Sequence, residues 1–379
     1  MILPGATLGV LGGGQLGRMF TMRAREMGYR VIVLEPDAGS PAGAVADRHI
    51  QAAYDDPAAL DLLASECAAI TIEFENVPAG ALQRLAQTIP VRPSAEAVSV
   101  AQDRIREKTF LRDHGFGMAP FCPVTNGDEL AAAFESVGAP ALLKTSRLGY
   151  DGKGQLPIGT LADLGTAFGN FGGVPCVLEQ RLDLEAELSV VLVRGTDGGT
   201  VPFPAGENCH RAGILDTTVV PARIGHALAT EAAQLAAAVA ARLEYVGVLA
   251  VELFVARGGR LFVNEIAPRP HNSGHYTLDA CVTDQFEQQV RALCELPLGS
   301  PALLSPVAMV NVLGDVWAGG PPRWDRALAL PGVKLHLYGK AEPRPGRKMG
   351  HLNCMAGTAD DALALARRAY AGLLDHPSP

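Results

Sequence analysis

The chain has 379 residues, of which 48% are hydrophobic and 19% are charged. Because single hydrophobic cores stop growing at roughly 250–300 residues, this length predicts two or three domains. A formal net charge of -8 gives no general attraction for nucleic acid or anionic membranes, so any anionic ligand must be held by local basic groups.

The cysteines and the beginning of the chain exclude further classes of protein. The seven cysteines lie far apart and contain no C-x-x-C pair, which argues against a disulfide framework and a zinc site. The first residues carry no basic leader, and no apolar run approaches the roughly 18 residues of a membrane span. We therefore expect a cytoplasmic enzyme with reduced thiols.

The first part of the chain alternates short apolar strands with amphipathic helices. Strands are expected at 6–11, 30–34 and 69–74, which is the pattern of a parallel βαβ sheet. A charged helix, AQDRIREKTFLRDHG, then closes at Gly115 and is typical of a connection between domains. The first domain is expected to span residues 1–103.

A small α+β unit is expected next, over residues 104–186. It begins with a capping box at Thr125 and Asp128 and contains the strands ALLKT and VPCVLEQ.

The largest unit is expected over residues 187–379. Longer strands joined by hairpin turns predict an antiparallel sheet, and Thr358 with Asp361 predicts the start of a final helix.

Gly12, Gly14 and Gly17 form a G-x-G-x-x-G after the first strand, and Glu35 ends the next one. This spacing satisfies the dinucleotide fingerprint, so an NAD-dependent dehydrogenase is a rival hypothesis. The backbone amides of such a turn can equally hold another anion, including a substrate phosphate. The motif predicts an anion site and leaves its ligand open.

A second glycine loop, Gly149–Gln155, follows the strand that ends at Lys144. Its three glycines allow the backbone to approach a polyphosphate, and Lys144 and Lys153 add positive charge. The loop lacks the G-K-[ST] of a Walker motif, and a plain hairpin turn remains an alternative.

The segment VGVLAVELFVARGGRLFVNEIAP predicts two apolar strands joined by a tight turn. With Gly258 and Gly259 as a two-residue turn, Glu252 and Glu265 would lie directly opposite each other. Facing carboxylates repel unless a cation compensates, and Mg²⁺ takes one or two carboxylates together with substrate phosphates. Asn264 could add an oxygen. A solvent-facing hairpin with two incidental acids is the alternative.

Polar and basic residues follow the second of these strands. In APRPHNSGH, Arg269 could pair with a bicarbonate or carboxyphosphate oxyanion, and His271 could orient it or move a proton. Near the end of the chain, Lys340, Arg347 and Lys348 stand out in an acidic protein and suit a ribose phosphate, although a solvated basic loop would look the same.

Taken together, GGGQLGRM, EFENV, GYDGKGQ, the E-N-x-H of Glu207 to His210, NEIAPRPHNSGH and PGRKMGH resemble the N5-carboxyaminoimidazole ribonucleotide synthetases, a family that includes the ATPase subunit of phosphoribosylaminoimidazole carboxylase. The match runs in order along nearly the whole chain. The resemblance implies an ATP-grasp fold with α/β and α+β parts and an N-terminal Rossmann-like pre-ATP-grasp domain. It also implies a homodimeric ligase of purine biosynthesis that joins 5-aminoimidazole ribonucleotide and bicarbonate through carboxyphosphate.

Site residues follow from the resemblance position by position. Magnesium ligands, expected to hold two ions, are implied at Glu252 and Glu265. Bicarbonate and carboxyphosphate are implied at Arg269, His271 and Asn272, with Lys153 helping to neutralise the transferring phosphoryl group. The ribonucleotide is implied at Tyr150, Asp151, Lys340 and Arg347, near Lys348, Gln15 and Leu16. ATP contacts are implied at Arg104, Lys144, Gly149, Tyr150, Asp151, Gly152, Lys153, Gly154, Gln155, Glu179, Gln180, Arg181, Leu182, Glu187, His210, Asn264 and Glu265.

Two positions depart from the family pattern. Leu148 stands where a glycine is common before the second glycine loop, and Asp284 stands where a serine is often found. The nearest alternative activity is a formate-activating ATP-grasp transferase that acts on glycinamide ribonucleotide. A non-catalytic nucleotide sensor is a further alternative, but it would be expected to lack the two metal carboxylates.

Overall fold

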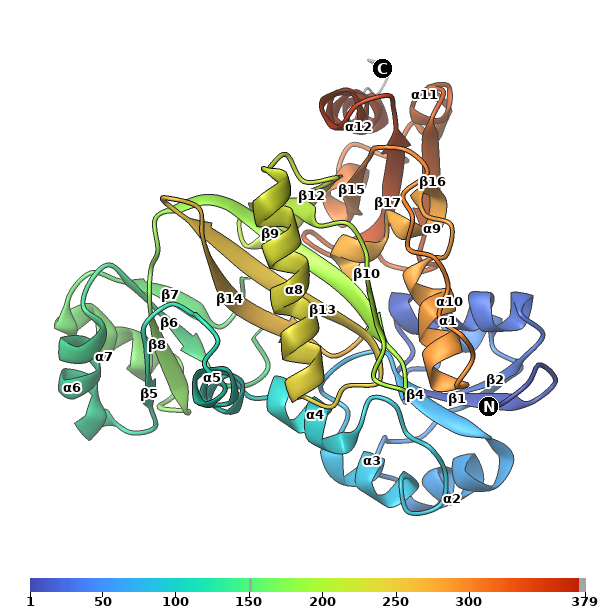
Figure 1. Ribbon diagram of the computed structural model, residues 1–379, viewed down its shortest axis with the longest axis horizontal. Helices are drawn as coiled ribbons and strands as arrows, with labels where there is room; N and C mark the ends of the chain where they lie inside the picture. Colours follow the sequence, from blue (N-terminus) through green and yellow to red (C-terminus); the bar gives the residue numbers. More distant parts are fainter. Residues whose placement is uncertain (150–151, 375–379) are drawn as a thin grey trace.

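A computed structural model of the protein describes residues 1–149 and 152–374. Tyr150 and Asp151, both expected in the site, therefore lie outside the described residues. The described part of the chain forms three β-sheets, each with its own helices (Figure 1). Among these residues, no helix combines the length and the apolar character that crossing a bilayer requires.

The first sheet is parallel, with the strand order β3-β2-β1-β4, which confirms the predicted βαβ pattern. The strands β1, β2 and β4 are largely apolar and buried because helices cover both faces of the sheet. The elements are β1 (Thr7–Leu11), α1 (Gln15–Glu26), β2 (Arg30–Leu34), β3 (Arg48–Ile50), α2 (Pro57–Glu66), β4 (Ala69–Ile72), α3 (Ala79–Leu85) and α4 (Ala95–Ala101).

The second sheet is small and antiparallel, with the order β5-β8-β6-β7. Its two helices pack on one side and close a separate apolar core. In Figure 1 this unit lies to one side of the molecule. The elements are β5 (Phe121–Val124), α6 (Leu130–Val137), β6 (Ala141–Thr145), β7 (Gln155–Ile158), α7 (Leu161–Asn170) and β8 (Cys176–Gln180).

The predicted capping box at Thr125 is wrong. Asn126 accepts a hydrogen bond from the Asp128 amide at 3.0 Å and starts a short 3₁₀ turn, so α6 begins only at Leu130. Thr125 bonds Glu129 instead. An asparagine next to the threonine competes for the same amide, and sequence spacing alone does not decide between them.

The predicted cap of the final helix is present. The Thr358 hydroxyl accepts a hydrogen bond from the Asp361 amide at 3.1 Å, and α12 (Ala359–Leu374) starts at the next residue.

The third sheet is the largest, with the order β14-β13-β9-β11-β12-β15-β17-β16 and β10 paired to β9. Neighbouring strands are antiparallel, as predicted. The strands are β9 (Leu184–Arg194), β10 (Thr200–Pro202), β11 (Gly206–Arg211), β12 (Ile214–Val220), β13 (Gly247–Ala256), β14 (Arg260–Ala267), β15 (Val307–Leu313), β16 (Val333–Leu337) and β17 (Lys348–Met355).

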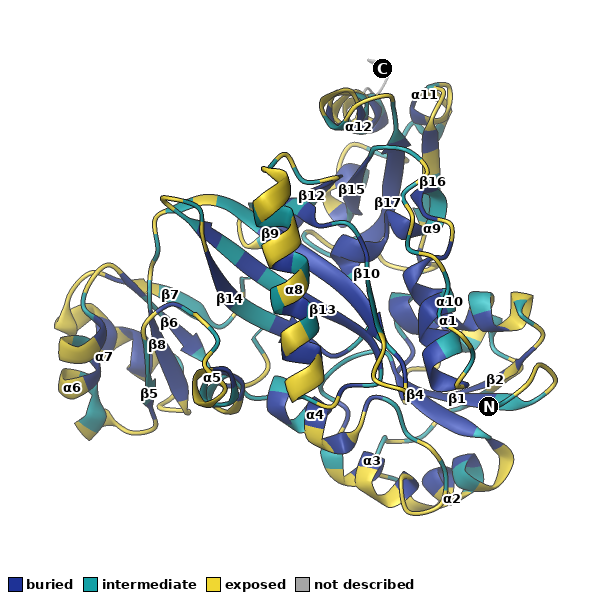
Figure 2. Ribbon diagram, viewed as in Figure 1, coloured by how far each residue is buried: buried dark blue, intermediate teal, exposed yellow. Residues whose placement is uncertain are grey.

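Helices cover this sheet in several places. One long helix lies across β9 and β13 with its outer side exposed (Figures 1 and 2). It contributes alanines and Val239 to the core, because small side chains let a helix approach a sheet closely. The remaining helices are α5 (Arg104–Asp113), α8 (His226–Arg242), which is the long one, α9 (Thr277–Ala280), α10 (Gln285–Leu293) and α11 (Trp324–Leu328).

One predicted domain boundary lies at the start of a helix, and the other lies within a strand. α5 begins directly after the first boundary, and the Asp103 carboxylate caps it by accepting from two amides of its first turn. The second boundary falls inside β9, which pairs with β13 of the large sheet. The domain limits remain predictions at 1–103, 104–186 and 187–379.

Helix α10 joins the parallel sheet to the large sheet. Asp284 caps this helix by accepting from the amides of its first turn, and it also pairs with Arg23 of α1 at 2.6 Å. Gln289 donates to the Thr71 hydroxyl at 2.8 Å and accepts from the Val248 amide at 2.6 Å. The aspartate that departs from the family pattern therefore serves both as a helix cap and as an ion-pair partner across this junction.

Two sequence motifs meet in a buried stack of histidines. His275 ends NEIAPRPHNSGH and His351 ends PGRKMGH, and their rings lie 4.8 Å apart. His336 stacks on the other side of His351 at 4.6 Å and bonds Asp279 at 2.7 Å. Burial, followed by the neighbouring imidazoles, holds the pKa values of His275 and His351 well below the ordinary 6.5. Both rings are therefore neutral in the folded protein.

This stack predicts a pH dependence of stability. In the unfolded chain His351 takes up a proton below pH 6.5, while the buried ring does not, so stability is lost as the pH falls. Each such histidine contributes a slope of about 1.4 kcal/mol per pH unit in that range. His351→Asn should make the loss of unfolding free energy between pH 7.5 and 5 smaller by about 2 kcal/mol, because about 1.5 pH units of that range lie below the ordinary pKa. Urea unfolding at the two pH values measures this loss. Gln87→Asn, an exposed substitution that removes no titrating group, should keep the parental pH dependence, and an unchanged pH dependence in His351→Asn would contradict the assignment.

Candidate active site

A cavity of about 1070 Å³ lies where elements of all three sheets meet. Every predicted site residue within the described part of the chain lines it. These residues are Gln15, Leu16, Arg104, Lys144, Gly149, Gly152, Lys153, Gly154, Gln155, Glu179, Gln180, Arg181, Leu182, Glu187, His210, Glu252, Asn264, Glu265, Arg269, His271, Asn272, Lys340, Arg347 and Lys348.

Glu252 and Glu265 are paired directly across β13 and β14, as predicted. The turn is not the predicted one, because Ala256 pairs with Arg260 and leaves three residues between them. That register alone would not place the two glutamates opposite each other. An extra residue in β14, Asn264, forms a β-bulge and restores the pairing beyond it.

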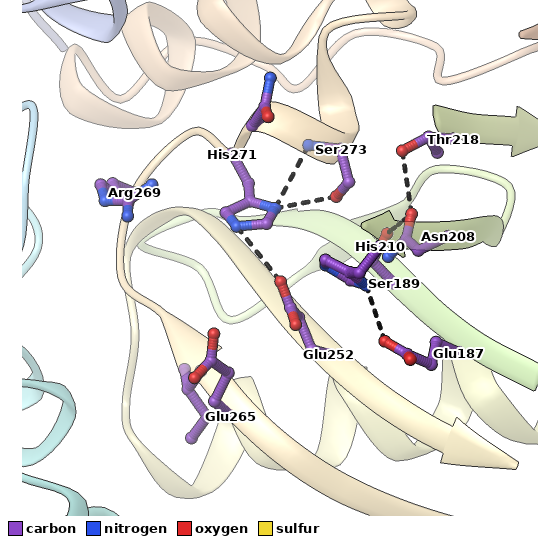
Figure 3. A network of polar contacts seen from close by, with 12 residues as sticks. Glu187, Ser189, Asn208, His210, Thr218, Glu252, Glu265, Arg269, His271 and Ser273 are labelled. Atoms are coloured by element: carbon purple, nitrogen blue, oxygen red, sulfur yellow. Dashed lines mark hydrogen bonds and ion pairs between the residues drawn. The ribbon is translucent and has the colours of Figure 1, made fainter. Parts of the chain in front are cut away.

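The two carboxylates have different surroundings. Burial, followed by the charge of Glu265, raises the pKa of Glu252. Burial also acts to raise the pKa of Glu265, but Arg104, Lys144 and Lys108 together outweigh it, so the pKa is lowered. Arg104 donates to the Glu265 carboxylate at 2.9 Å. In Figure 3 both carboxylates point into the same space, below Arg269 and His271.

The donor set fits a magnesium ion that also binds phosphate. The Asn264 side-chain oxygen is buried without a hydrogen-bond partner, beside the two facing carboxylates. Across the described ranges no group of three or more His, Cys, Asp or Glu side chains is arranged to hold a metal ion. Two carboxylates and an amide oxygen suit Mg²⁺, which takes its remaining ligands from water and nucleotide phosphates.

Glu179 lies buried between two lysines. It accepts from Lys144 at 2.9 Å and pairs with Lys108 at 3.3 Å. Burial opposes ionisation, but the charges of the two lysines outweigh it and lower the pKa of Glu179 to about 2. The remaining carboxylate oxygen is buried and has no protein partner. One oxygen of Glu179 thus holds the lysines in place at the cavity, and the other is available to a ligand.

Close backbone packing places the second glycine loop against a hairpin tip. A Cβ on Gly152 would lie 2.9 Å from Gly213 Cα, between β11 and β12, so a larger residue would force the two segments apart. Gly152 and Gly154 both have a φ of +75°, and Leu148 has a φ of +62° with its side chain 70% exposed. A leucine rarely adopts this left-handed conformation, so its backbone is strained.

Glu187 and His210 form a pair on neighbouring strands of the large sheet. The Glu187 carboxylate lies 2.7 Å from the His210 Nδ1, as Figure 3 shows. Burial would lower the pKa of His210, but the contact with Glu187 outweighs it and raises the pKa. The pair adds a polar group to the wall of the cavity, and His210 stands on the strand that leads to the hairpin tip against which the glycine loop packs.

The loop after β14 places three polar side chains at the cavity. Arg269 donates to Glu75 at 2.5 Å, and the Asn272 amide bonds the buried amide of Asn311. His271 bonds Ser273 at 2.8 Å and lies 3.4 Å from Glu252. Burial, followed by the charge of Arg269, keeps the pKa of His271 well below its ordinary value, so the imidazole is neutral.

The first glycine motif already holds an anion from the protein itself. The Glu73 carboxylate accepts hydrogen bonds from the Gly14 amide at 2.7 Å and the Gly17 amide at 3.0 Å. Glu35, which a dinucleotide ribose would need, accepts from the Tyr54 hydroxyl at 2.5 Å. The prediction of an anion site is confirmed, but its occupant is a side chain of the protein. The amides and the carboxylate that would bind NAD are both already hydrogen-bonded within the protein, which argues against the dehydrogenase hypothesis.

The individual roles of three acids at the cavity wall and of one lysine behind it could not be predicted from the sequence patterns. Glu73 and Glu75, both in the motif EFENV, follow strand β4 at the same sheet edge as the glycine motif, which is the position where polar residues of a parallel sheet are expected. Glu107 and Lys108 stand on a helix that the sequence indicated only as a connection between domains.

The basic residues near the end of the chain lie on one wall of the cavity. Lys340 donates to the Lys348 carbonyl at 2.8 Å and lies 5.6 Å from the Tyr338 ring centre. Arg347 donates to the Glu342 carbonyl at 2.9 Å. These contacts fold the basic segment against β17.

Family models match three successive parts of the chain. A ribonucleotide synthetase preATP-grasp domain matches residues 5–102, an ATP-grasp domain matches 109–286, and a phosphoribosylaminoimidazole carboxylase C-terminal domain matches 307–365. The N5-carboxyaminoimidazole ribonucleotide synthase of Brucella melitensis is 46% identical over 351 residues, which cover 92% of this chain and 96% of that protein. The chain belongs to the N5-carboxyaminoimidazole ribonucleotide synthase family.

Solved structures of this family have the same fold. An N5-carboxyaminoimidazole ribonucleotide synthetase in its ADP complex is 43% identical, with a TM-score of 0.93, and 98% of this chain matches 97% of that one. The Aspergillus clavatus enzyme with ADP and 5-aminoimidazole ribonucleotide is 31% identical, with a TM-score of 0.89 and coverage of 97% and 98%. The predicted ATP-grasp fold and the predicted ligase class are thereby confirmed.

The buried contacts of Glu179 predict a loss of stability when they are removed. Glu179→Ala leaves two buried lysines without their shared carboxylate, which should lower the free energy of unfolding by about 3 to 5 kcal/mol. Because the folded pKa is below the ordinary 4.5, this contribution is complete above pH 4.5 and is lost as the pH falls toward 2. Urea unfolding at pH 7 measures the loss. Glu135→Ala, at an exposed site in the same unit, is the control; equal stabilities of the two variants would exclude the role of Glu179.

Proposed function

We propose that this chain carboxylates 5-aminoimidazole ribonucleotide with bicarbonate, using ATP and releasing ADP and phosphate. The observation that carries the proposal is the position of Glu252 and Glu265, which face each other between a lysine-lined phosphate loop and the polar loop around Arg269. The family to which the chain belongs performs this reaction class, and the Aspergillus clavatus relative binds both ADP and the ribonucleotide.

ATP would lie between the small sheet and the large sheet. Arg104, Lys144, the glycine loop with Lys153, the segment Glu179–Leu182 and the pair of Glu187 with His210 line this part of the cavity. Mg²⁺ bound at Glu252 and Glu265, with Asn264 beside them, would neutralise charge on the phosphates. Lys144 and Lys153 would stabilise the charge that develops on the transferring phosphoryl group.

Bicarbonate would bind at the loop after β14. Arg269 would pair with the oxyanion of bicarbonate or carboxyphosphate, in exchange for or beside its contact with Glu75. The neutral His271 can accept or donate a hydrogen bond without adding charge. Asn272, bonded to Asn311, would fix the backbone of this loop. Carboxyphosphate would then pass its carboxyl group to the exocyclic amine, directly or as carbon dioxide.

The ribonucleotide would occupy the side of the cavity formed by the first and last parts of the chain. Lys340, Arg347 and Lys348 would hold its phosphate, with Gln15 and Leu16 nearby. Tyr150 and Asp151 complete the proposed contacts, by resemblance to the family. A homodimeric state and a cytoplasmic location are proposed on the same basis.

The reaction predicts a strict requirement for three substrates. Phosphate release should need ATP, 5-aminoimidazole ribonucleotide and bicarbonate together for full rate, because the acid that ATP activates is bicarbonate. A phosphate-release assay with each substrate omitted in turn tests this. Formate in place of bicarbonate should not support turnover. Release of ADP that does not depend on bicarbonate would refute the proposed order.

The proposed magnesium ligands predict a loss of ATP turnover when one of them is replaced. Glu265→Gln should lower magnesium-dependent ATP turnover by more than about 100-fold, since loss of a direct ligand exceeds the 10–100-fold effect of outer partners. The isosteric amide should leave the circular dichroism spectrum unchanged. Glu231→Gln, an exposed position on α8, should behave as the parent. Unaltered turnover in Glu265→Gln would exclude the metal assignment.

A further inference from the structure

The strand that carries Glu265 is an edge strand. β14 ends the large sheet, so one row of its backbone groups has no neighbouring strand. The bulge at Asn264 also removes regular ladder bonds on the side that faces β13. Buried apolar side chains hold the overall register of β14, but the backbone at the bulge needs other partners to keep Glu265 turned toward Glu252.

Helix α5 supplies the missing partners on both sides of Glu265. Lys108 donates to the Asn264 carbonyl at 2.9 Å, and Glu107 accepts from the Ile266 amide at 2.5 Å. Arg104, one turn earlier on the same face of the helix, bonds the Glu265 side chain itself. One helix face therefore contacts three consecutive residues of β14.

The two side chains of α5 that bond the β14 backbone are charged and buried. Glu107 is 2% exposed and Lys108 is 1% exposed, so both side chains have left water almost completely. Desolvation of charged groups is costly unless they are paired and hydrogen-bonded. Apolar side chains would fill the same volume, but they would leave the Asn264 carbonyl and the Ile266 amide without these partners.

Lys108 also reaches the small sheet, where it lies 3.3 Å from Glu179. That carboxylate is already bonded to Lys144 at 2.9 Å, whereas the contact of Lys108 with the Asn264 carbonyl is the shorter of its two. Lys108 therefore contacts both the bulge and the small sheet. Its contact with Glu179 ties the bulge to β8, the neighbour of the strand that carries Lys144.

We infer that Glu107 and Lys108 are positioning residues that hold the β14 bulge, and with it the facing of Glu265 and Glu252 that a nucleotide-bound Mg²⁺ requires. Their action is indirect, through the backbone on either side of Glu265. The inference rests on the proposed function only in so far as it assumes that Mg²⁺ binds with ATP at these carboxylates. It assigns to α5 a role beyond connecting two parts of the chain.

The experiment compares Glu107→Ala, Glu107→Gln and Lys108→Met with the parent. Titration calorimetry with a non-hydrolysable ATP analogue, at a series of Mg²⁺ concentrations, gives the Mg²⁺ concentration for half-saturation. Glu107→Ala and Lys108→Met should raise it about 10-fold or more, as the loss of partners behind metal ligands does. Glu107→Gln keeps an oxygen that accepts from the Ile266 amide, so it should behave as the parent. Binding of the analogue without Mg²⁺ should change little.

A second measurement does not depend on nucleotide. Hydrogen exchange of the β14 amides should become faster in Glu107→Ala and Lys108→Met and stay parental in Glu107→Gln. Arg112→Ala is the matched control, because Arg112 lies on the same helix, is exposed, and pairs with Asp113. If Glu107→Ala does not fold, Glu107→Met, which fills the same volume without an acceptor, takes its place, because Lys108→Met also removes the contact with Glu179.

Two results would overturn the inference. One is a parental Mg²⁺ dependence in a folded Glu107→Ala or Lys108→Met variant, and the other is a Glu107→Gln variant as impaired as Glu107→Ala. Failure of the proposed function would give a different result. ADP release would then not depend on bicarbonate, while the substitutions on α5 could still change the Mg²⁺ dependence of nucleotide binding. Failure of the inference alone would leave bicarbonate-dependent turnover intact.

Discussion

Two carboxylates face each other at the centre of this structure, and much of the surrounding arrangement balances their repulsion. Glu265 is compensated by Arg104, whereas Glu252 lies beside a neutral His271. The balance is therefore unequal, and burial together with the charge of Glu265 raises the pKa of Glu252, so this carboxyl tends to keep a proton. A divalent cation that arrives with ATP would take the place of that proton, so nucleotide and metal are expected to bind together.

Much of the fold could be predicted because periodic patterns report directly on burial. Continuous apolar runs indicated a parallel sheet, and longer strands with hairpin turns indicated an antiparallel one. The facing of Glu252 and Glu265 was predicted correctly from a turn that the structure does not contain. Two deviations offset each other there, a longer turn and the bulge at Asn264, and no sequence pattern marks either of them.

Contacts between distant segments could not be predicted from local patterns. The first glycine motif has the spacing that binds dinucleotides, and only the folded chain shows that Glu73 fills its amides. The partners of β14 on α5 were missed for a similar reason, since they join side chains to backbone groups far along the chain. The family resemblance identified the residues around the cavity but not the contacts that hold them.

The histidine stack limits which segments can be exchanged between related enzymes in a chimera. His275 follows the loop proposed for bicarbonate, and His351 stands on the strand that begins with Lys348, so one packing contact joins the two substrate segments. A chimera that replaced only the C-terminal segment would place a foreign surface against His275. The two segments should therefore be transplanted as a unit, because neither is an independent module.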